Sequence, residues 1–257
     1  MKLGFLGTGA ITSAMVTGLN SPGGGEHSIL LSPRNAAVAA DLAARFPQVS
    51  VASSNQEVVD ECGAVVIAVR PQIAESVLAE LRFPPDREVI SLVSGFSVGR
   101  LRGLIAPATG VTRAVPLPSA ARRRSPTAIY PRDGYTIELF ALVGAAFAVD
   151  TEREFDALCT ATATMATYFA FADGAASWLA RNGIPPEQAR DYIARIYAGL
   201  SDTAMEDPER SFQALAADHA TRGGINELVL KLLTEHGTFQ KFAESLDVVM
   251  RRVTAAK

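Results

Sequence analysis

Two periodicities alternate along roughly the first 150 residues of the chain. Short runs rich in Val, Ile and Leu are typical of buried strands, and apolar residues recurring every three or four positions are typical of helices. Strands are expected at 2–6, 28–32, 49–52, 64–69, 88–93, 110–115 and 127–131. Helices are expected at 10–19, 36–46, 55–61, 72–81 and 98–104.

Repeated strand–helix units imply a mostly parallel sheet that is covered by helices on both faces. The run at 64–69 is apolar on both alternating faces, as a central parallel strand should be. Strand patterns stop after 145–152, and the rest of the chain predicts helices with breaks at 182–185, 207–208 and Gly237. We therefore expect two domains, 1–150 and 151–257.

A Gly-x-Gly sequence, Gly7-Thr8-Gly9, follows the first predicted strand and opens a helix. This arrangement brings backbone N–H groups and a helix N-terminus towards a pyrophosphate. The motif is imperfect, because Thr12 stands where the third glycine or an alanine is usual. The motif and the strand–helix units around it predict a Rossmann-type dinucleotide-binding domain rather than a merely structural turn.

The end of the second predicted strand indicates which nucleotide is bound. Proteins that bind NAD usually place an acidic residue there, against the ribose 2′-hydroxyl. This chain instead has Ser32, Arg34 and Asn35, and a guanidinium suits a 2′-phosphate. NADP is the predicted cofactor and NAD remains possible, with an ordinary solvated loop as the alternative role of Arg34.

Composition excludes other classes of protein. The formal charge is −3 and no basic run is present, so neither a nucleic acid nor a membrane is an expected partner. The N-terminus lacks the pattern of a signal peptide, and a cytoplasmic location is expected. Cys62 and Cys159 show no metal-ligand spacing, so neither a metal site nor a disulfide framework is expected.

Six segments together resemble the pyrroline-5-carboxylate reductases over nearly the whole chain. They are GFLGTGAITSAM at 4–15, AVRPQ at 68–72, ISLVSGFSVGRL at 90–101, TRAVPLP at 112–118, NGIPPEQA at 182–189 and RGGINE at 222–227. The resemblance implies an NAD(P)H-dependent oxidoreductase that acts on a C=N bond of a cyclic imine carboxylate, most simply pyrroline-5-carboxylate reduced to proline. It also implies a Rossmann domain followed by an all-α dimerisation domain, and hence a homodimer or a larger homo-oligomer.

The same resemblance assigns cofactor contacts. The implied cofactor-binding residues are Gly7, Thr8, Gly9, Ala10, Ile11, Ser32, Arg34, Asn55, Ala68, Val69, Arg70 and Pro71. The first five would meet the pyrophosphate, Ser32 and Arg34 the 2′-phosphate, and Asn55 the adenine ribose. Arg70 stands where the family usually has lysine, and a plain surface charge is its alternative role.

The implied substrate side departs from the family pattern. The implied substrate-binding residues are Pro116, Leu117, Gly223, Gly224 and Asn226. Leu117 replaces an asparagine, which makes the predicted wall beside the nicotinamide less polar. The two glycines keep the backbone N–H groups that would hold a substrate carboxylate, and Asn226 replaces a hydroxyl.

Hydride transfer from a nicotinamide needs mainly correct placement of the acceptor carbon, so a strong acid is optional. Thr164 and Asn226 are the candidate catalytic residues that could guide the imine nitrogen. For Thr164 the alternative is a polar residue that caps a helix start. Asp173 could be an acid, but a helix-surface carboxylate is the expected role.

Two other functions stay open at this point. A β-hydroxyacid dehydrogenase has a similar domain order but needs a helix-borne lysine, and this chain has no lysine between Lys2 and Lys231. A non-catalytic dinucleotide sensor or partner-binding protein is compatible with the altered substrate motifs. Oxidation of the cofactor by candidate imines would separate the sensor from an enzyme.

Overall fold

The computed structural model describes residues 2–255 and divides into two compact units. The first unit comprises the chain up to Cys159 together with the segment from Arg251 onwards, and the second unit is Thr160–Met250. These units are defined by how compactly the residues pack, so they do not test the predicted domains 1–150 and 151–257. The boundary near residue 150 stays a prediction.

The first unit is built around an eight-stranded sheet with the order β3-β2-β1-β4-β5-β6-β7-β8. The strands are β1 (Leu3–Leu6), β2 (Ile29–Leu31), β3 (Val49–Val51), β4 (Ala64–Ile67), β5 (Glu88–Ser91), β6 (Val111–Val115), β7 (Ser125–Tyr130) and β8 (Gly144–Ala148). Strands β1 to β6 are parallel, β7 is antiparallel to β6, and β8 is parallel to β7. The predicted α/β class with a mostly parallel, Rossmann-type sheet is confirmed.

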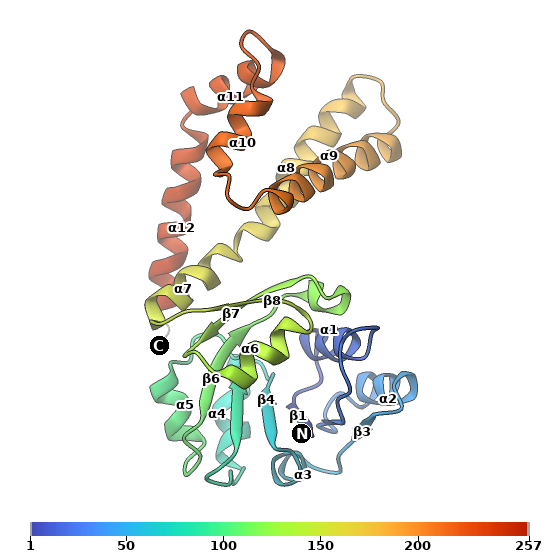
Figure 1. Cartoon of the computed structure of the whole chain (residues 1–257), viewed down its shortest axis with the longest axis vertical. Helices are drawn as coiled ribbons and strands as arrows, with labels where there is room; N and C mark the ends of the chain where they lie inside the picture. The colour runs from blue at the N-terminus through green and yellow to red at the C-terminus, as the bar shows by residue number, and fades with distance from the viewer. Residues whose placement is uncertain (1, 256–257) are drawn as a thin grey trace. The chain divides into compact units, whose positions relative to one another are not determined.

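Helices lie on both faces of this sheet (Figure 1). They are α1 (Ala10–Leu19), α2 (Ala36–Arg45), α3 (Asn55–Glu61), α4 (Pro71–Ala79), α5 (Val98–Leu104), the 3₁₀ helix η1 (Pro118–Arg122), α6 (Gly134–Ala141) and α7 (Glu152–Ala161). Side chains alternate between two buried cores along each strand, so that Val66 faces α1, α2 and α6 while Val65 faces α3, α4 and α5. Burial on both faces explains why the central strands are apolar throughout.

The second unit is entirely helical, as expected, and its last helix continues past Met250. The helices are α8 (Thr164–Arg181), α9 (Pro186–Glu206), α10 (Phe212–His219), α11 (Ile225–Glu235) and α12 (Thr238–Ala255). The breaks at 182–185, 207–208 and Gly237 all fall between these helices, as predicted. Two further breaks lie at 162–163 and 220–224, and the second contains the Gly223-Gly224 turn that the resemblance implied.

Apolar side chains of the second unit are widely exposed. Within the described residues, helices α8, α10, α11 and α12 contain no fully buried residue. Phe169 is 68% exposed, Trp178 57% and Ile225 82%. Isolated exposed apolar residues are ordinary, but a concentration of large ones on several helices marks a surface that another molecule covers.

Cys62 is a free thiol that is buried beneath β1 and α3. Burial raises the pKa of the Cys62 thiol to about 11, which leaves it unreactive near neutral pH. Among residues 2–255, no helix is both long enough and apolar enough to cross a bilayer.

Candidate active site

The predicted cofactor residues follow the carboxyl ends of four neighbouring strands. They come after β1 at 7–11, after β2 at 32–34, after β3 at Asn55 and after β4 at 68–71. Because these strands are parallel, all four segments lie at one edge of the sheet. The strand order reverses between β1 and β4, and such a switch point is where open α/β sheets bind ligands.

The glycine turn, defined as residues 7–9, leads from β1 into α1. Gly7 has φ of +101°, and a Cβ atom there would lie 2.7 Å from the carbonyl oxygen of Ala68. Gly9 is different, because a Cβ atom there would meet no heavy atom of residues 2–255 within 4 Å. Gly7 is therefore needed for the fold of the turn, whereas the open space at Gly9 fits the close approach of a ligand to the backbone.

Ser32 supports the glycine turn from inside the protein. Its side chain is fully buried, and its hydroxyl accepts the N–H of Gly7 at 2.9 Å. The hydroxyl of Thr8, itself almost fully buried, donates to the carbonyl oxygen of Ser32 at 3.0 Å. The contact that the structure gives Ser32 is thus with the turn, and its contact with a 2′-phosphate stays a prediction.

Two further residues fix the turn, and sequence analysis assigned neither of them a role there. Thr12 is buried and its hydroxyl donates to the carbonyl oxygen of Gly7 at 2.7 Å. Asn35 adopts φ of +65° and its amide donates to the carbonyl oxygen of Thr8 at 2.8 Å. Asparagine tolerates the αL conformation, so the role of Asn35 could have been predicted from the sequence. The hydrogen bond from Thr12, which stands at the position of the usual third glycine, could not be predicted from residue spacing.

The remaining predicted cofactor residues are accessible to a ligand. Arg34 and Arg70 are exposed, and Asn55 is half-buried in the first turn of α3. Arg70 is the N-cap residue of α4, and Pro71 is the first residue of that helix. Ala10 is exposed, and Ile11, Ala68 and Val69 are half-buried.

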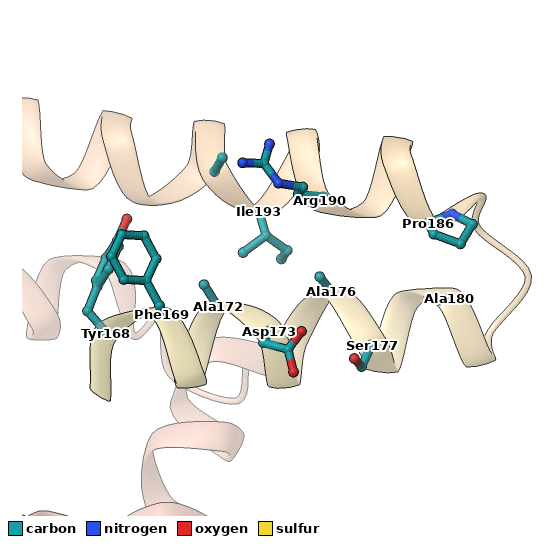
Figure 2. Close-up of a pocket in the computed structure, with 11 residues that line it drawn as sticks. Tyr168, Phe169, Ala172, Asp173, Ala176, Ser177, Ala180, Pro186, Arg190 and Ile193 are labelled. Atoms are coloured by element: carbon teal, nitrogen blue, oxygen red, sulfur yellow. The ribbon is translucent and has the colours of Figure 1, made fainter. Parts of the chain in front are cut away.

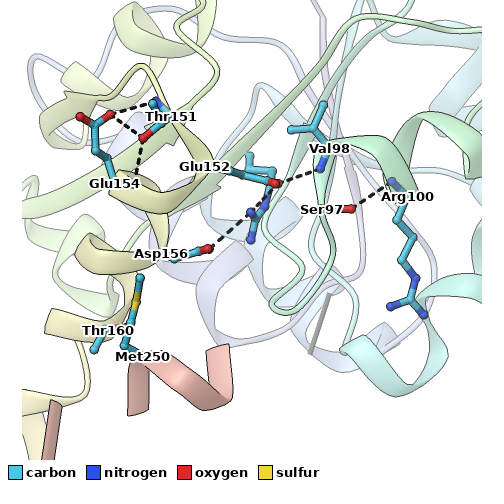
Figure 3. Close-up of polar contacts among 10 residues, drawn as sticks. Ser97, Val98, Arg100, Thr151, Glu152, Glu154, Asp156, Thr160 and Met250 are labelled. Atoms are coloured by element: carbon cyan, nitrogen blue, oxygen red, sulfur yellow. Dashed lines mark hydrogen bonds and ion pairs between the residues drawn. The ribbon is translucent and has the colours of Figure 1, made fainter. Parts of the chain in front are cut away.

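A buried ion-pair cluster holds β6 against α7 and α5. Arg113 of β6 is only 4% exposed, and its Nη1 lies 3.0 Å from Glu152 Oε1 and 3.7 Å from Asp156 Oδ1. Its guanidinium also lies over the ring of Phe155, 4.3 Å from the centroid. Glu152 Oε1 accepts the N–H of Val98 at the start of α5 as well (Figure 3). The cluster therefore fixes the strand that leads towards residues 116–117.

Pro116 and Leu117 follow β6 directly. Pro116 is buried and Leu117 is half-buried, and the N–H of Leu117 donates to the hydroxyl of Ser125 at 2.8 Å. The backbone of Leu117 is thus anchored to β7. Its apolar side chain gives this position no hydrogen-bonding group.

Thr164 is the first residue of α8 and is half-buried. Its hydroxyl donates to the carbonyl oxygen of Ala161 at 2.8 Å, which is the local backbone bond considered as the alternative to a catalytic role. Thr164 also lines a small hollow of about 160 Å³ with Phe171 and Phe242. A hydroxyl in that hollow retains its acceptor lone pairs.

The α11 turn, defined as residues 220–224, precedes helix α11 and contains both predicted substrate-binding glycines. The N–H of Gly223 donates to Glu227 Oε2 at 2.7 Å, and the N–H of Gly224 donates to the carbonyl oxygen of Thr221 at 2.8 Å. The amide of Asn226 donates to the carbonyl oxygen of His219 at 3.0 Å. Sequence analysis missed Glu227, although an acidic residue in the first turn of a helix is favoured by the helix dipole.

A mixed groove of about 410 Å³ lies between α8 and α9 (Figure 2). Its walls carry Tyr168 and Phe169 from α8 and Ile193 from α9, with Asp173 and Arg190 as its charged residues. A second groove of about 570 Å³ lies between α9 and α10. None of the predicted site residues lines either groove, so these grooves belong to the exposed apolar surface rather than to the cofactor site.

The strand order, the glycine turn at the switch point and the helical second half define a two-domain Rossmann-type dinucleotide-binding protein. Residues 2–95 match the family model described as NADP oxidoreductase coenzyme F420-dependent. Residues 152–255 match the model described as pyrroline-5-carboxylate reductase dimerisation.

Similar proteins agree with these matches. The chain is 22% identical to pyrroline-5-carboxylate reductase of Haemophilus influenzae over 97% of this chain and 95% of the relative. It is 25% identical to the enzyme of Pseudomonas aeruginosa over 65% of this chain, and that match spans 64% of the relative's length. The solved Plasmodium falciparum pyrroline carboxylate reductase with NADP bound has a TM-score of 0.83 and 18% identity, covering 100% of this chain and 98% of the other. The C-terminal part of the chain thus resembles the dimerisation domain of the pyrroline-5-carboxylate reductases, and the relatives named here are reductases of that kind.

Proposed function

We propose that this protein is an NADPH-dependent reductase of cyclic imine carboxylates, which converts pyrroline-5-carboxylate to proline or reduces a related imine. The observation that supports this most strongly is a dinucleotide-type glycine turn in the same chain as a match to the pyrroline-5-carboxylate reductase dimerisation model. The cytoplasm is the proposed location.

The first unit fits a dinucleotide at the edge formed by the carboxyl ends of β1 to β4. Gly9 leaves open space at the N-terminus of α1, where backbone N–H groups and the helix dipole favour a pyrophosphate. We assign the pyrophosphate to residues 7–11 and the adenine ribose to Asn55. The backbone of residues 68–71 would line the rest of the dinucleotide.

Arg34 is the residue that we assign to the 2′-phosphate. Its side chain is exposed beside the glycine turn, and guanidinium binds phosphate through two parallel N–H bonds. Ser32 would act mainly by holding Gly7, because its hydroxyl is already bonded there. NADP is therefore the preferred cofactor, and NAD would bind more weakly.

NADPH, when bound, supplies the hydride. The chain's own task is to hold the imine and to exclude competing orientations. We assign Pro116 and Leu117 to the wall beside the nicotinamide, and the N–H groups of Gly223 and Gly224 to the substrate carboxylate.

The imine nitrogen needs a hydrogen-bonding partner as it gains electron density. The amide of Asn226 carries two N–H bonds, of which the bond to His219 uses one. The hydroxyl of Thr164 donates to Ala161 and can still accept a hydrogen bond. We propose that Asn226 or Thr164 orients the nitrogen.

We also propose that the protein works as a homodimer or a larger homo-oligomer. The match of residues 152–255 to a dimerisation model and the exposed apolar side chains of α8 to α12 support this. A second copy of the chain would cover the grooves between α8 and α9 and between α9 and α10.

The direct test is a panel of cyclic imines assayed for NADPH consumption with the purified full-length chain. We expect pyrroline-5-carboxylate to be reduced to proline, with the product identified by chromatography. Reduction of none of the imines, with NADPH still bound, would favour the non-catalytic sensor instead.

A further inference from the structure

The α11 turn already holds a carboxylate that belongs to the protein. Glu227 Oε2 accepts the N–H of Gly223 at 2.7 Å, at the positive end of helix α11. Hydrogen bonds between a carboxylate and backbone N–H groups are among the stronger ones that proteins make. The turn therefore holds a carboxylate in this structure, and that carboxylate comes from its own helix.

The other donor of the turn also has an internal acceptor. The N–H of Gly224 donates to the carbonyl oxygen of Thr221 at 2.8 Å. An incoming carboxylate that needs the N–H of Gly223 must consequently take it from Glu227. Two carboxylates cannot share this single donor without strong repulsion between their charges.

The bond from Glu227 differs from ordinary helix capping. In a capping box the glutamate accepts the N–H of the N-cap residue, and here the N-cap residue is Gly224. The bonded donor is instead Gly223, one residue earlier, which has φ of +76°. Glu227 is exposed, so its side chain can turn away into water without breaking any packing.

We propose that Glu227 is a resident competitor of the substrate carboxylate and a specificity-determining residue of this site. The proposal rests on the proposed function, in which the α11 turn holds the carboxylate of the imine. A carboxylated imine has to displace Glu227, whereas an imine without a carboxylate does not. Glu227 therefore reduces the difference in binding affinity between carboxylated and uncharged imines.

The test compares Glu227→Gln with wild type on two substrates, pyrroline-5-carboxylate and 1-pyrroline, which lacks the carboxylate. Glutamine keeps an oxygen that can accept the N–H of Gly223 but removes the charge, so the turn keeps its conformation. The matched control is Glu235→Gln, which removes the same charge from the other end of α11. Glu235 is exposed and pairs with Lys231.

We expect Glu227→Gln to lower KM for pyrroline-5-carboxylate about fivefold and to leave KM for 1-pyrroline within about twofold. Glu235→Gln should leave both values unchanged. Equal changes on both substrates, no change on either, or the same effect from Glu235→Gln would each overturn the proposal.

A binding experiment separates this proposal from the proposed function. L-proline and pyrrolidine are titrated calorimetrically into each variant in the presence of NADP. If L-proline binds more tightly to Glu227→Gln than to wild type, and pyrrolidine binds equally to both, the competition is supported even if neither imine is reduced. Unchanged or undetectable binding of L-proline in both proteins overturns it, whatever the assays of NADPH consumption give.

Discussion

The two units bury their apolar residues to very different extents. The first unit has two cores, one on each face of its sheet, and large side chains such as Phe5 and Phe140 are fully buried there. In the second unit large side chains such as Phe169 and Ile225 lie mostly in solvent. The first unit therefore accounts for its own hydrophobic stabilisation, whereas the second has a surface that requires a partner.

The largest expected effect comes from the core of the first unit. Phe140→Ala should lower the free energy of unfolding by about 3–5 kcal/mol, because it leaves a cavity between α6 and the sheet. Urea denaturation followed by circular dichroism measures this loss. The matched control is Phe147→Ala on β8, where the ring is half exposed and the loss should stay under about 1 kcal/mol. Equal losses would contradict the picture of a self-contained core.

Cofactor choice should depend on the first unit alone. Arg34→Asp should raise KM for NADPH about a hundredfold and change KM for NADH little, since it sets a carboxylate against the 2′-phosphate. Steady-state kinetics with both cofactors measures the difference. Arg82→Asp, which introduces the same charge at another exposed position, is the control. An equal rise in KM for NADPH and NADH would show that Arg34 does not bind the 2′-phosphate.

Assembly should depend on the second unit. Phe169→Arg places a charge on the exposed apolar face of α8 and should raise the dissociation constant of the dimer about thirtyfold. Sedimentation velocity over a range of concentrations measures this. Glu80→Arg introduces the same side chain at an exposed position of the first unit and should leave the association unchanged. If the wild-type chain sediments as a compact monomer at micromolar concentration, the proposed homodimer is wrong.

The smallest effect tests the support of the glycine turn. Ser32→Ala removes the acceptor for the N–H of Gly7 and should raise KM for NADPH and NADH equally, by about fivefold. The comparison with Arg34→Asp is informative, because a support residue weakens both cofactors and a phosphate-binding residue weakens one. A loss confined to NADPH would instead give Ser32 the direct contact with the 2′-phosphate.

Much of the fold follows from periodicity and turn chemistry. The predicted strand at 64–69 contains β4, and the predicted helix at 10–19 coincides with α1. The reversal of β7 was missed, yet the sequence contained evidence for it. Only nine residues, 116–124, separate β6 from β7, and a parallel crossover usually needs a dozen or more.

The candidate site was harder to predict in detail, because its residues act through contacts that are distant in sequence. The bond between Gly7 and Ser32 joins positions 25 residues apart, and only the folded sheet brings β1 beside β2. A sequence motif could place Ser32 near the cofactor but could not show that its hydroxyl points inward. The competition at Gly223 likewise depends on the rotamer of Glu227, which no spacing rule determines.

The fluorescence of Trp178 can report on the association of two chains. It is the one tryptophan of the chain, and it lies largely exposed on α8. Its indole emission therefore reports the polarity at a single place, on the helix that we expect a second chain to cover. A shift of that emission to shorter wavelength as the protein is concentrated would follow association in real time, without any label.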